Sequence, residues 1–89
     1  MFEAYNAFLR RKGLPEERRL HCHAQGYDTV ERPLARYEET LKFAPGMNVG
    51  IHPGFGNQRL FMTVCDNYLI GADGAPERLH KTPSRIFTK

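Results

Sequence analysis

Glycine and proline recur at short intervals after residue 25, and this spacing constrains the fold more than any other feature of the chain. The breaks fall at Gly26, Pro33, Pro45-Gly46, Pro53-Gly54 and 71–74. Residues of this kind end regular elements and mark turns. We therefore predict that most of the chain consists of short strands joined by turns.

The first twelve residues follow a different pattern, with apolar side chains repeating at helical spacing. The apolar face comprises Phe2, Tyr5, Phe8 and Leu9. Basic residues occupy 10–12, where the carbonyl end of a helix favours cations. Gly13 can adopt a left-handed cap and Pro15 prevents continuation. The sequence therefore predicts one N-terminal helix.

Three later segments are predicted as strands. Residues 20–23 form a short candidate, and 47–51 alternate apolar with polar or small residues. Residues 60–70 are the most apolar run; periodicity alone leaves open a hairpin turning at Asp66-Asn67 or one long strand. The predicted fold class is α+β, an N-terminal helix followed by an antiparallel curved sheet.

Length and charge exclude several classes of protein. With 89 residues the chain forms one small domain at most. The early basic residues, at 10–12 and 18–19, are interrupted by Glu16 and Glu17, so we interpret them as a solvated helix end and predict no nucleic-acid partner. No stretch is long and apolar enough for a membrane span, and residues 1–12 are too charged for a secretory signal. Two unpatterned cysteines favour a reducing compartment, and we expect a cytoplasmic protein.

Four motifs in order resemble the pita-bread hydrolases, the family of Xaa-Pro peptidases, methionine aminopeptidase and creatinase. His23-Ala24-Gln25-Gly26, followed by Glu31 and Pro33, is similar to His-Gly-x-Gly and then His-Glu-x-Pro. Residues 46–54 are similar to Gly-Met-x-hydrophobic-x-x-Glu-Pro-Gly, and 64–70 to the last strand, Ile-Glu-Asp-x-hydrophobic. Residues 73–79 are similar to the family's ending.

The resemblance implies a domain of two related halves about a pseudo-two-fold axis, with a curved sheet whose concave side carries the site. Residues 1–89 would be a single partial domain, the C-terminal half. Residues 59–70 would then be one continuous strand. The expected partner is the missing N-terminal half, or a second copy replacing it.

The resemblance also implies a site that departs from the family pattern. Peptidase members hold two divalent metal ions with two Asp, one His and two Glu. His23 matches the His ligand, whereas His52 and Cys65 occupy the two Glu positions. Val30 replaces the second His of the His-Glu pair, and Glu31 retains its place as a candidate catalytic residue beside His23. Two carboxylates of a two-metal site are therefore absent.

Three interpretations of His23, His52 and Cys65 remain open. They could hold one zinc ion or another divalent metal as a His2Cys set, although their spacing is not that of a local zinc motif. They could be ordinary residues in a vacated pocket. They could also support metal-independent chemistry of the creatinase kind, with His23 or His52 as acid or base.

The functional prediction is a C-terminal fragment of a metallopeptidase-like hydrolase, inactive alone, with a degenerate metal site. The substrate of such a parent would be a peptide or a small amide. The alternatives are a non-catalytic dimerising module and a small zinc-binding protein.

Overall fold

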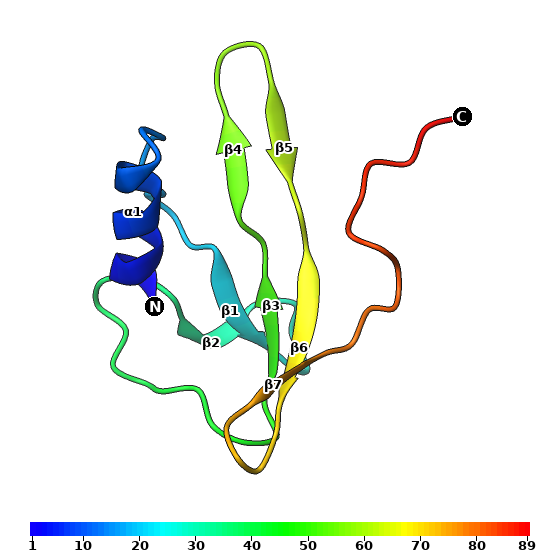
Figure 1. Cartoon of the computed structure of the whole chain (residues 1–89). Coiled ribbons are helices and arrows are strands. Elements are labelled where there is room, and N and C mark those ends of the chain that lie inside the picture. Colours follow the sequence, from blue (N-terminus) through cyan, green and yellow to red (C-terminus); the bar gives the residue numbers. More distant parts are fainter.

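One helix and seven strands make up the fold, in a computed structural model that describes residues 1–89 (Figure 1). The elements are α1 (Phe2–Arg11), β1 (Cys22–Gln25), β2 (Glu31–Leu34), β3 (Asn48–Ile51), β4 (Gly54–Gly56), β5 (Phe61–Thr63), β6 (Asp66–Ile70) and β7 (Pro76–Arg78). Five strands form an antiparallel sheet in the order β2-β1-β3-β6-β7, and β4 pairs with β5 in a separate hairpin. The α+β class predicted from the sequence is confirmed.

The predicted helix is present and ends as its sequence indicates. Gly13 has a φ of +67°, and its N–H donates to the Arg10 carbonyl, while the Leu14 N–H donates to the Leu9 carbonyl. These two bonds form a Schellman cap, which requires the left-handed conformation that glycine adopts without strain. The predicted apolar face is partly wrong: Phe8 is exposed, and the buried positions are Phe2, Asn6 and Leu9.

A buried asparagine explains why the helix is rotated away from the predicted face. The Asn6 side chain is 1% exposed. Its Nδ2 donates to the Glu17 carbonyl at 3.1 Å, and the Glu17 N–H donates to its Oδ1 at 2.8 Å. A buried amide needs such partners. This pair fixes the segment after α1 along the helix and directs the chain into β1.

The three central strands of the sheet are β1, β3 and β6, and their register separates two kinds of side chain. Cys22 lies opposite Ile51 and Ala24 opposite Val49, so these four residues share one face. That face is the core: Cys22, Ala35 and Val49 are buried, with Phe43, Met47, Ile51 and Ile70 packed against them. The intervening residues, among them His23, Gly50 and Asn67, belong to the other face.

The run 60–70 is neither of the two arrangements that periodicity left open. Asp66-Asn67 is not a turn but the start of β6, which pairs with β3. The expected single strand over 59–70 is also wrong, because Val64 and Cys65 separate β5 from β6. The chain nevertheless continues in one direction through both strands, and the β4–β5 hairpin extends beyond the sheet beside α1 (Figure 1).

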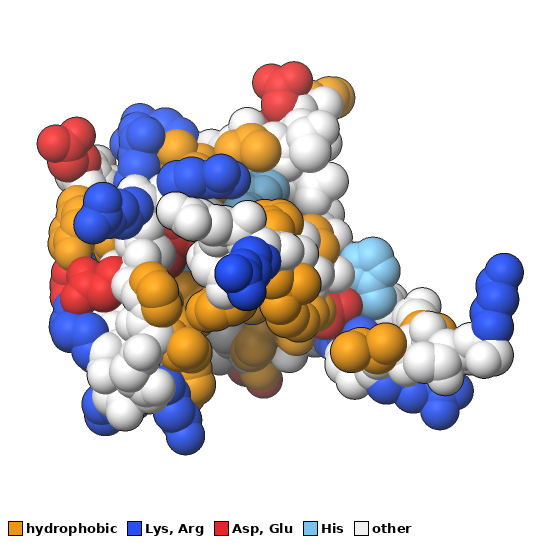
Figure 2. Space-filling view, turned by 90° about the horizontal axis from the view of Figure 1, so that it is seen from above, with side chains coloured by type: hydrophobic (Ala, Val, Ile, Leu, Met, Phe, Trp, Pro, Cys, Tyr) orange, Lys and Arg blue, Asp and Glu red, His pale blue; other side chains and the backbone are white.

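Few residues of the chain are buried. Only 11 of the 89 residues are buried, whereas Phe61, Met62 and Val64 along and after β5 are 71%, 49% and 51% exposed. In the view from above, several hydrophobic side chains lie next to one another near the middle of the visible face (Figure 2). The segment that follows β7 projects from one side of the molecule (Figure 2). None of the helical structure is long and apolar enough to cross a membrane.

Candidate functional site

His23 lies at the centre of the polar face of the sheet. It belongs to β1 and pairs with Gly50 of β3, which in turn pairs with Asn67 of β6. Its Nδ1 is 2.9 Å from the Ala24 carbonyl oxygen. Because a carbonyl only accepts, Nδ1 donates in this bond, and in the neutral tautomer Nε2 is the acceptor. The imidazole is 6% exposed.

Gly50 provides the space that the His23 ring occupies. A Cβ at this position would lie 3.1 Å from His23 Cε1 and 3.4 Å from its Nε2. Both distances are at or below ordinary van der Waals contact, so any larger residue would displace the ring. The backbone at Gly50 is therefore the floor of the site.

His52 is the second predicted residue that the fold brings to this region. It directly follows β3, and its N–H donates to the His21 carbonyl at 2.7 Å. The centroids of the His23 and His52 rings are 5.0 Å apart, with an interplanar angle of 49°. Two residues 29 positions apart in the sequence thus form a contact pair of imidazoles.

The other two predicted residues lie differently. Cys65 is exposed in the break between β5 and β6, and it lines a cavity together with His52. Glu31 pairs with Ala24, the residue that follows His23 in β1, whereas His23 itself pairs with Leu34. Its Oε1 accepts the Asp28 N–H at 2.8 Å. Glu31 therefore closes the turn between β1 and β2.

The donor set does not fit the metal ions that the resemblance implies. No group of three or more His, Cys, Asp or Glu side chains is arranged to hold a metal ion. His23 and His52 form a pair, but Cys65 does not complete a three-ligand set with them. A two-metal site would also need carboxylates, and the corresponding positions carry His52 and Cys65.

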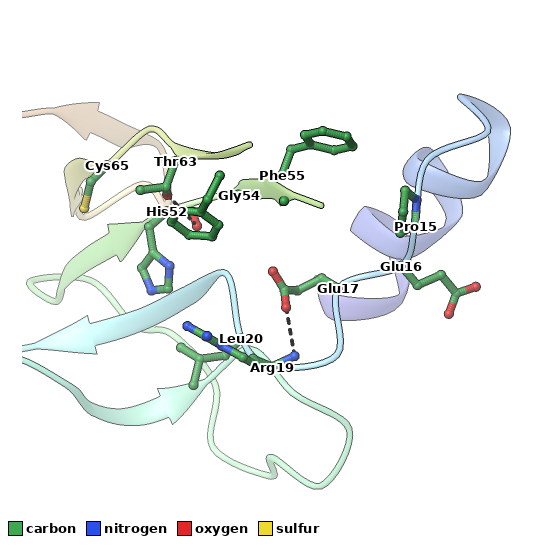
Figure 3. A pocket seen from close by; sticks show the side chains of 12 residues that line it. Pro15, Glu16, Glu17, Arg19, Leu20, His52, Gly54, Phe55, Thr63 and Cys65 are labelled. Carbon is green, nitrogen blue, oxygen red and sulfur yellow. Dashed lines mark hydrogen bonds between the residues drawn. The ribbon is translucent and has the colours of Figure 1, made fainter. Parts of the chain in front are cut away.

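The cavity next to His52 is a candidate recess of about 350 Å³. It lies between the segment that follows α1 and the base of the β4–β5 hairpin (Figure 3). Glu17 and Arg19 enter from one side, and Phe55 and Thr63 from the other. The Glu17 Oε1 accepts the Arg19 N–H at 2.9 Å. The recess therefore combines opposite charges with an aromatic wall.

His21 is buried outside this site. It is 4% exposed, and its ring lies 4.2 Å from Tyr5 and 6.0 Å from Phe2, centroid to centroid. Burial lowers the pKa of His21 below its ordinary value. Its Nδ1 has no hydrogen-bond partner. We assign it to packing beneath α1.

A network of polar side chains next to His23 was missed by sequence reasoning. Asn67 Nδ2 donates to Gln25 Oε1 at 2.7 Å and to Asn48 Oδ1 at 3.1 Å. His80 Nε2 lies 3.1 Å from Asn67 Oδ1 and is the donor of that bond. The signal available in the sequence was the polar alternation of 47–51, which places Asn48 and Gly50 on one face, but the partners come from strands distant in sequence.

Comparison of the chain with protein-family models, with curated proteins and with solved structures finds no match. The assignment of function therefore rests on the residues and their geometry.

Proposed function

We propose that the chain is the C-terminal half of a hydrolase of the pita-bread type, with a degenerate metal site and with His23 and His52 as its acid–base pair. The observation that carries the proposal is the contact of the two imidazoles, whose centroids are 5.0 Å apart. Imidazole is the side chain whose ordinary pKa suits proton transfer near neutral pH. The parent substrate would be a peptide or a small amide, and the location cytoplasmic.

The topology supports this proposal independently of the side chains. The three segments that resemble family motifs become β1, β3 and β6, which are neighbours in the sheet. His23 contacts His52, and His52 lines the same cavity as Cys65, which supports the proposal. The small buried core and the exposed apolar residues of β5 are also what a domain lacking its other half would present.

The chemistry follows from the hydrogen bond that orients His23. With Nδ1–H held by the Ala24 carbonyl, Nε2 of the neutral ring is the atom that can accept a proton from a water molecule or a substrate group. His52 can carry a proton toward the leaving group. We expect no turnover from the isolated chain, because half of the substrate pocket would come from the partner.

The direct test is ligand binding followed at the histidine rings by NMR. Glycylproline and creatine, one for each branch of the family, are titrated into the chain with labelled histidine. We expect saturable shifts at His23 and His52 for one of them, and loss of binding in His23→Ala and His52→Ala. Glu77→Gln, on the exposed edge strand β7, is the control. If neither compound moves either ring, the proposal is wrong.

The zinc interpretation predicts a different result in the same samples. Zinc would raise the melting temperature, and Ala replacement of His23, His52 or Cys65 would weaken that effect. Unchanged zinc affinity in all three variants would eliminate it.

A dimerising module is the second candidate, and β5 is the observation that favours it. This strand pairs only with β4, so its outer edge is free, and all three of its residues are exposed. An apolar strand with a free edge is a template for pairing with another chain. Light scattering at tens of micromolar checks this. A dimer that Met62→Lys converts to monomer would support the module, and a monomeric wild type would exclude it.

A further inference from the structure

We propose that a cavity of about 370 Å³ beside the start of α1 binds a phosphate monoester, and that Arg18, Arg19 and Arg36 hold its phosphate group. We name it the arginine cavity, because these three residues are among the seven that line it. Neither His23 nor His52 lines this cavity, so the inference goes beyond the proposed function.

The fold brings the three arginines together from two separate parts of the sequence. Arg18 and Arg19 precede β1, and Arg36 follows β2. Because β1 and β2 are antiparallel, the start of β1 and the end of β2 lie at the same end of the pair. The Ala35 N–H donates to the Cys22 carbonyl at 2.8 Å, which ties the residue before Arg36 to β1. The cluster is therefore a product of strand pairing and not of the basic run alone.

The backbone beneath the arginines is anchored on both sides of the cavity. The Glu17 backbone exchanges two hydrogen bonds with the buried Asn6 amide, at 2.8 and 3.1 Å. The Arg19 N–H donates to Glu17 Oε1 at 2.9 Å. On the other side, Ala35 is buried in the core next to Arg36. A fixed backbone lowers the entropy cost of ordering the side chains around a ligand.

The charges in the wall of the arginine cavity are unbalanced. The arginines that form ion pairs are Arg10, Arg32 and Arg78, and none of these lines the cavity. Glu38 is the one carboxylate in the wall, so three guanidinium groups less one carboxylate leave a formal charge of +2. A hollow lined mainly by one sign of charge concentrates ions of the opposite sign. The cavity therefore favours an anion.

A phosphate monoester matches the arginine cavity in charge and in acceptors. It carries nearly two negative charges near neutral pH and three strong acceptor oxygens. A single guanidinium can satisfy both oxygens of a carboxylate through two parallel bonds, whereas a phosphate has oxygens for more than one arginine. The cluster of three arginines thus selects a phosphate over a carboxylate.

An aromatic wall adjoins the arginines and offers a surface to the organic group of the ester. The Tyr37 and Phe2 rings are 4.7 Å apart, centroid to centroid, in an edge-to-face arrangement. Phe2 is 6% exposed and Tyr37 is 70% exposed, so Phe2 supports the Tyr37 ring from the core and leaves it open to a ligand. Phenyl phosphate should therefore bind more tightly than methyl phosphate.

The first test is a titration of the chain with methyl phosphate, followed by NMR at the arginine Nε–H signals. Dimethyl phosphate, which lacks one charge and one terminal oxygen, and acetate are the comparisons. We expect saturable shifts at Arg18 and Arg36, with methyl phosphate bound at least about tenfold more tightly than either comparison. An equal response to the three anions would overturn the proposal.

The second test uses Arg18→Gln and Arg36→Gln, because Arg19 also lines the recess next to His52 whereas Arg18 and Arg36 do not. Each variant should weaken the binding of methyl phosphate about tenfold, the loss of a charge-assisted hydrogen bond. Arg11→Gln removes the same charge from an exposed position outside the cavity and is the matched control. Equal weakening in Arg11→Gln would show that net charge alone attracts the anion, and the proposal would be wrong.

Two further variants test the wall of the arginine cavity. Glu38→Gln removes the opposing carboxylate and should strengthen the binding of methyl phosphate, a gain that unfolding could not produce. Weaker binding in this variant would contradict the charge argument. Tyr37→Ala should abolish the advantage of phenyl phosphate over methyl phosphate, and an advantage that persists would remove Tyr37 from the site.

The histidine variants keep this site distinct from the proposed function. His23→Ala and His52→Ala should bind methyl phosphate like the wild type, whatever they do to glycylproline or creatine. Loss of phosphate binding in either variant would place the anion in the recess next to His52 and overturn the arginine cavity as its site. A phosphotyrosine pentapeptide separates the two sources of such an ester. The small cavity volume favours a free ester, so the peptide should bind no more tightly than phenyl phosphate. Tighter binding of the peptide would assign the ester to a phosphorylated protein.

Discussion

The two faces of the central sheet are built from the same three strands, yet one carries buried apolar side chains and the other carries polar ones. One face carries Cys22, Ala24 and Val49, which are between 0% and 6% exposed and form the core. The other carries His23, Gly50 and Asn67, and Asn67 makes hydrogen bonds to other polar side chains there. The first face is covered by residues from the chain's own loops, such as Ala35 and Phe43, and the second is lined by polar side chains.

The difference shows that the fold depends on one face while the candidate chemistry belongs to the other. A change on the core face should act on stability, whereas a change on the polar face should act on binding. Each of the following predictions tests that division or one of the regions next to it.

A charge in the core should have the largest effect. Val49→Asp places a carboxylate among apolar side chains where no partner exists, a cost of about 3 kcal/mol or more. For a small domain this is a large fraction of the total stability, measured as a large fall in the melting temperature or loss of the cooperative melt. Asn48→Asp, the neighbouring residue on the polar face, should retain the transition. Equal damage from both would contradict the division.

The two thiols should differ strongly in reactivity. Burial raises the pKa of Cys22 to about 11, and its side chain is inaccessible, whereas Cys65 is exposed. Labelling with iodoacetamide near neutral pH should modify Cys65 at least about 100-fold faster than Cys22, since Cys22 reacts only after the structure opens. Peptide mass spectrometry measures both rates. In denaturant the rates should converge, and a similar ratio in both conditions would argue against a buried Cys22.

Glu39 links the loop after β2 to the sheet and should make stability depend on acid. It accepts from Arg32 at 2.7 Å and from the Leu34 N–H at 2.8 Å. The Arg32 bond, with the backbone bonds from Leu34 and Leu41, lowers the pKa of Glu39 from 4.5 to about 2. The carboxylate therefore stabilises the fold above its ordinary pKa, and this contribution is lost as the pH falls toward 2.

The variant Glu39→Gln should accordingly melt a few degrees lower than the wild type at neutral pH. The gap should narrow below pH 4.5 and close near pH 2. Glu77→Gln, on β7, is the control without these partners. A gap that stays constant with pH would show that the charge of Glu39 is not what stabilises the loop.

The smallest effect is expected at His21. Burial lowers its pKa, so the unfolded chain binds a proton more readily than the folded one. Stability should therefore fall as the pH drops below the ordinary value of about 6.5. His21→Phe keeps the packing against Phe2 and Tyr5 and removes the titration. Melting curves between pH 7 and 5 should be flatter for the variant, and an unchanged slope would assign the pH dependence to another group.

Much of the fold could be predicted from local pattern. Gly13 and Pro15 place the end of α1 correctly, and the alternation of 47–51 identifies β3. The helix face was harder, because Asn6 is polar and was not expected to be buried. Its burial depends on two bonds to Glu17, eleven residues away, which no local periodicity contains.

The candidate site divides in the same way. The sequence by itself indicated His23 and His52 as residues able to transfer protons, because that property belongs to the side chain. It also determined the short strands, since glycine and proline act on the backbone where they stand. The tertiary structure alone decided that the two imidazoles touch, that Cys65 does not join them, and that Glu31 serves a turn. It also placed Gln25, Asn48 and Asn67 around Gly50. Strand register sets those relations, and register results from hydrogen bonds and packing between segments that are remote in the sequence.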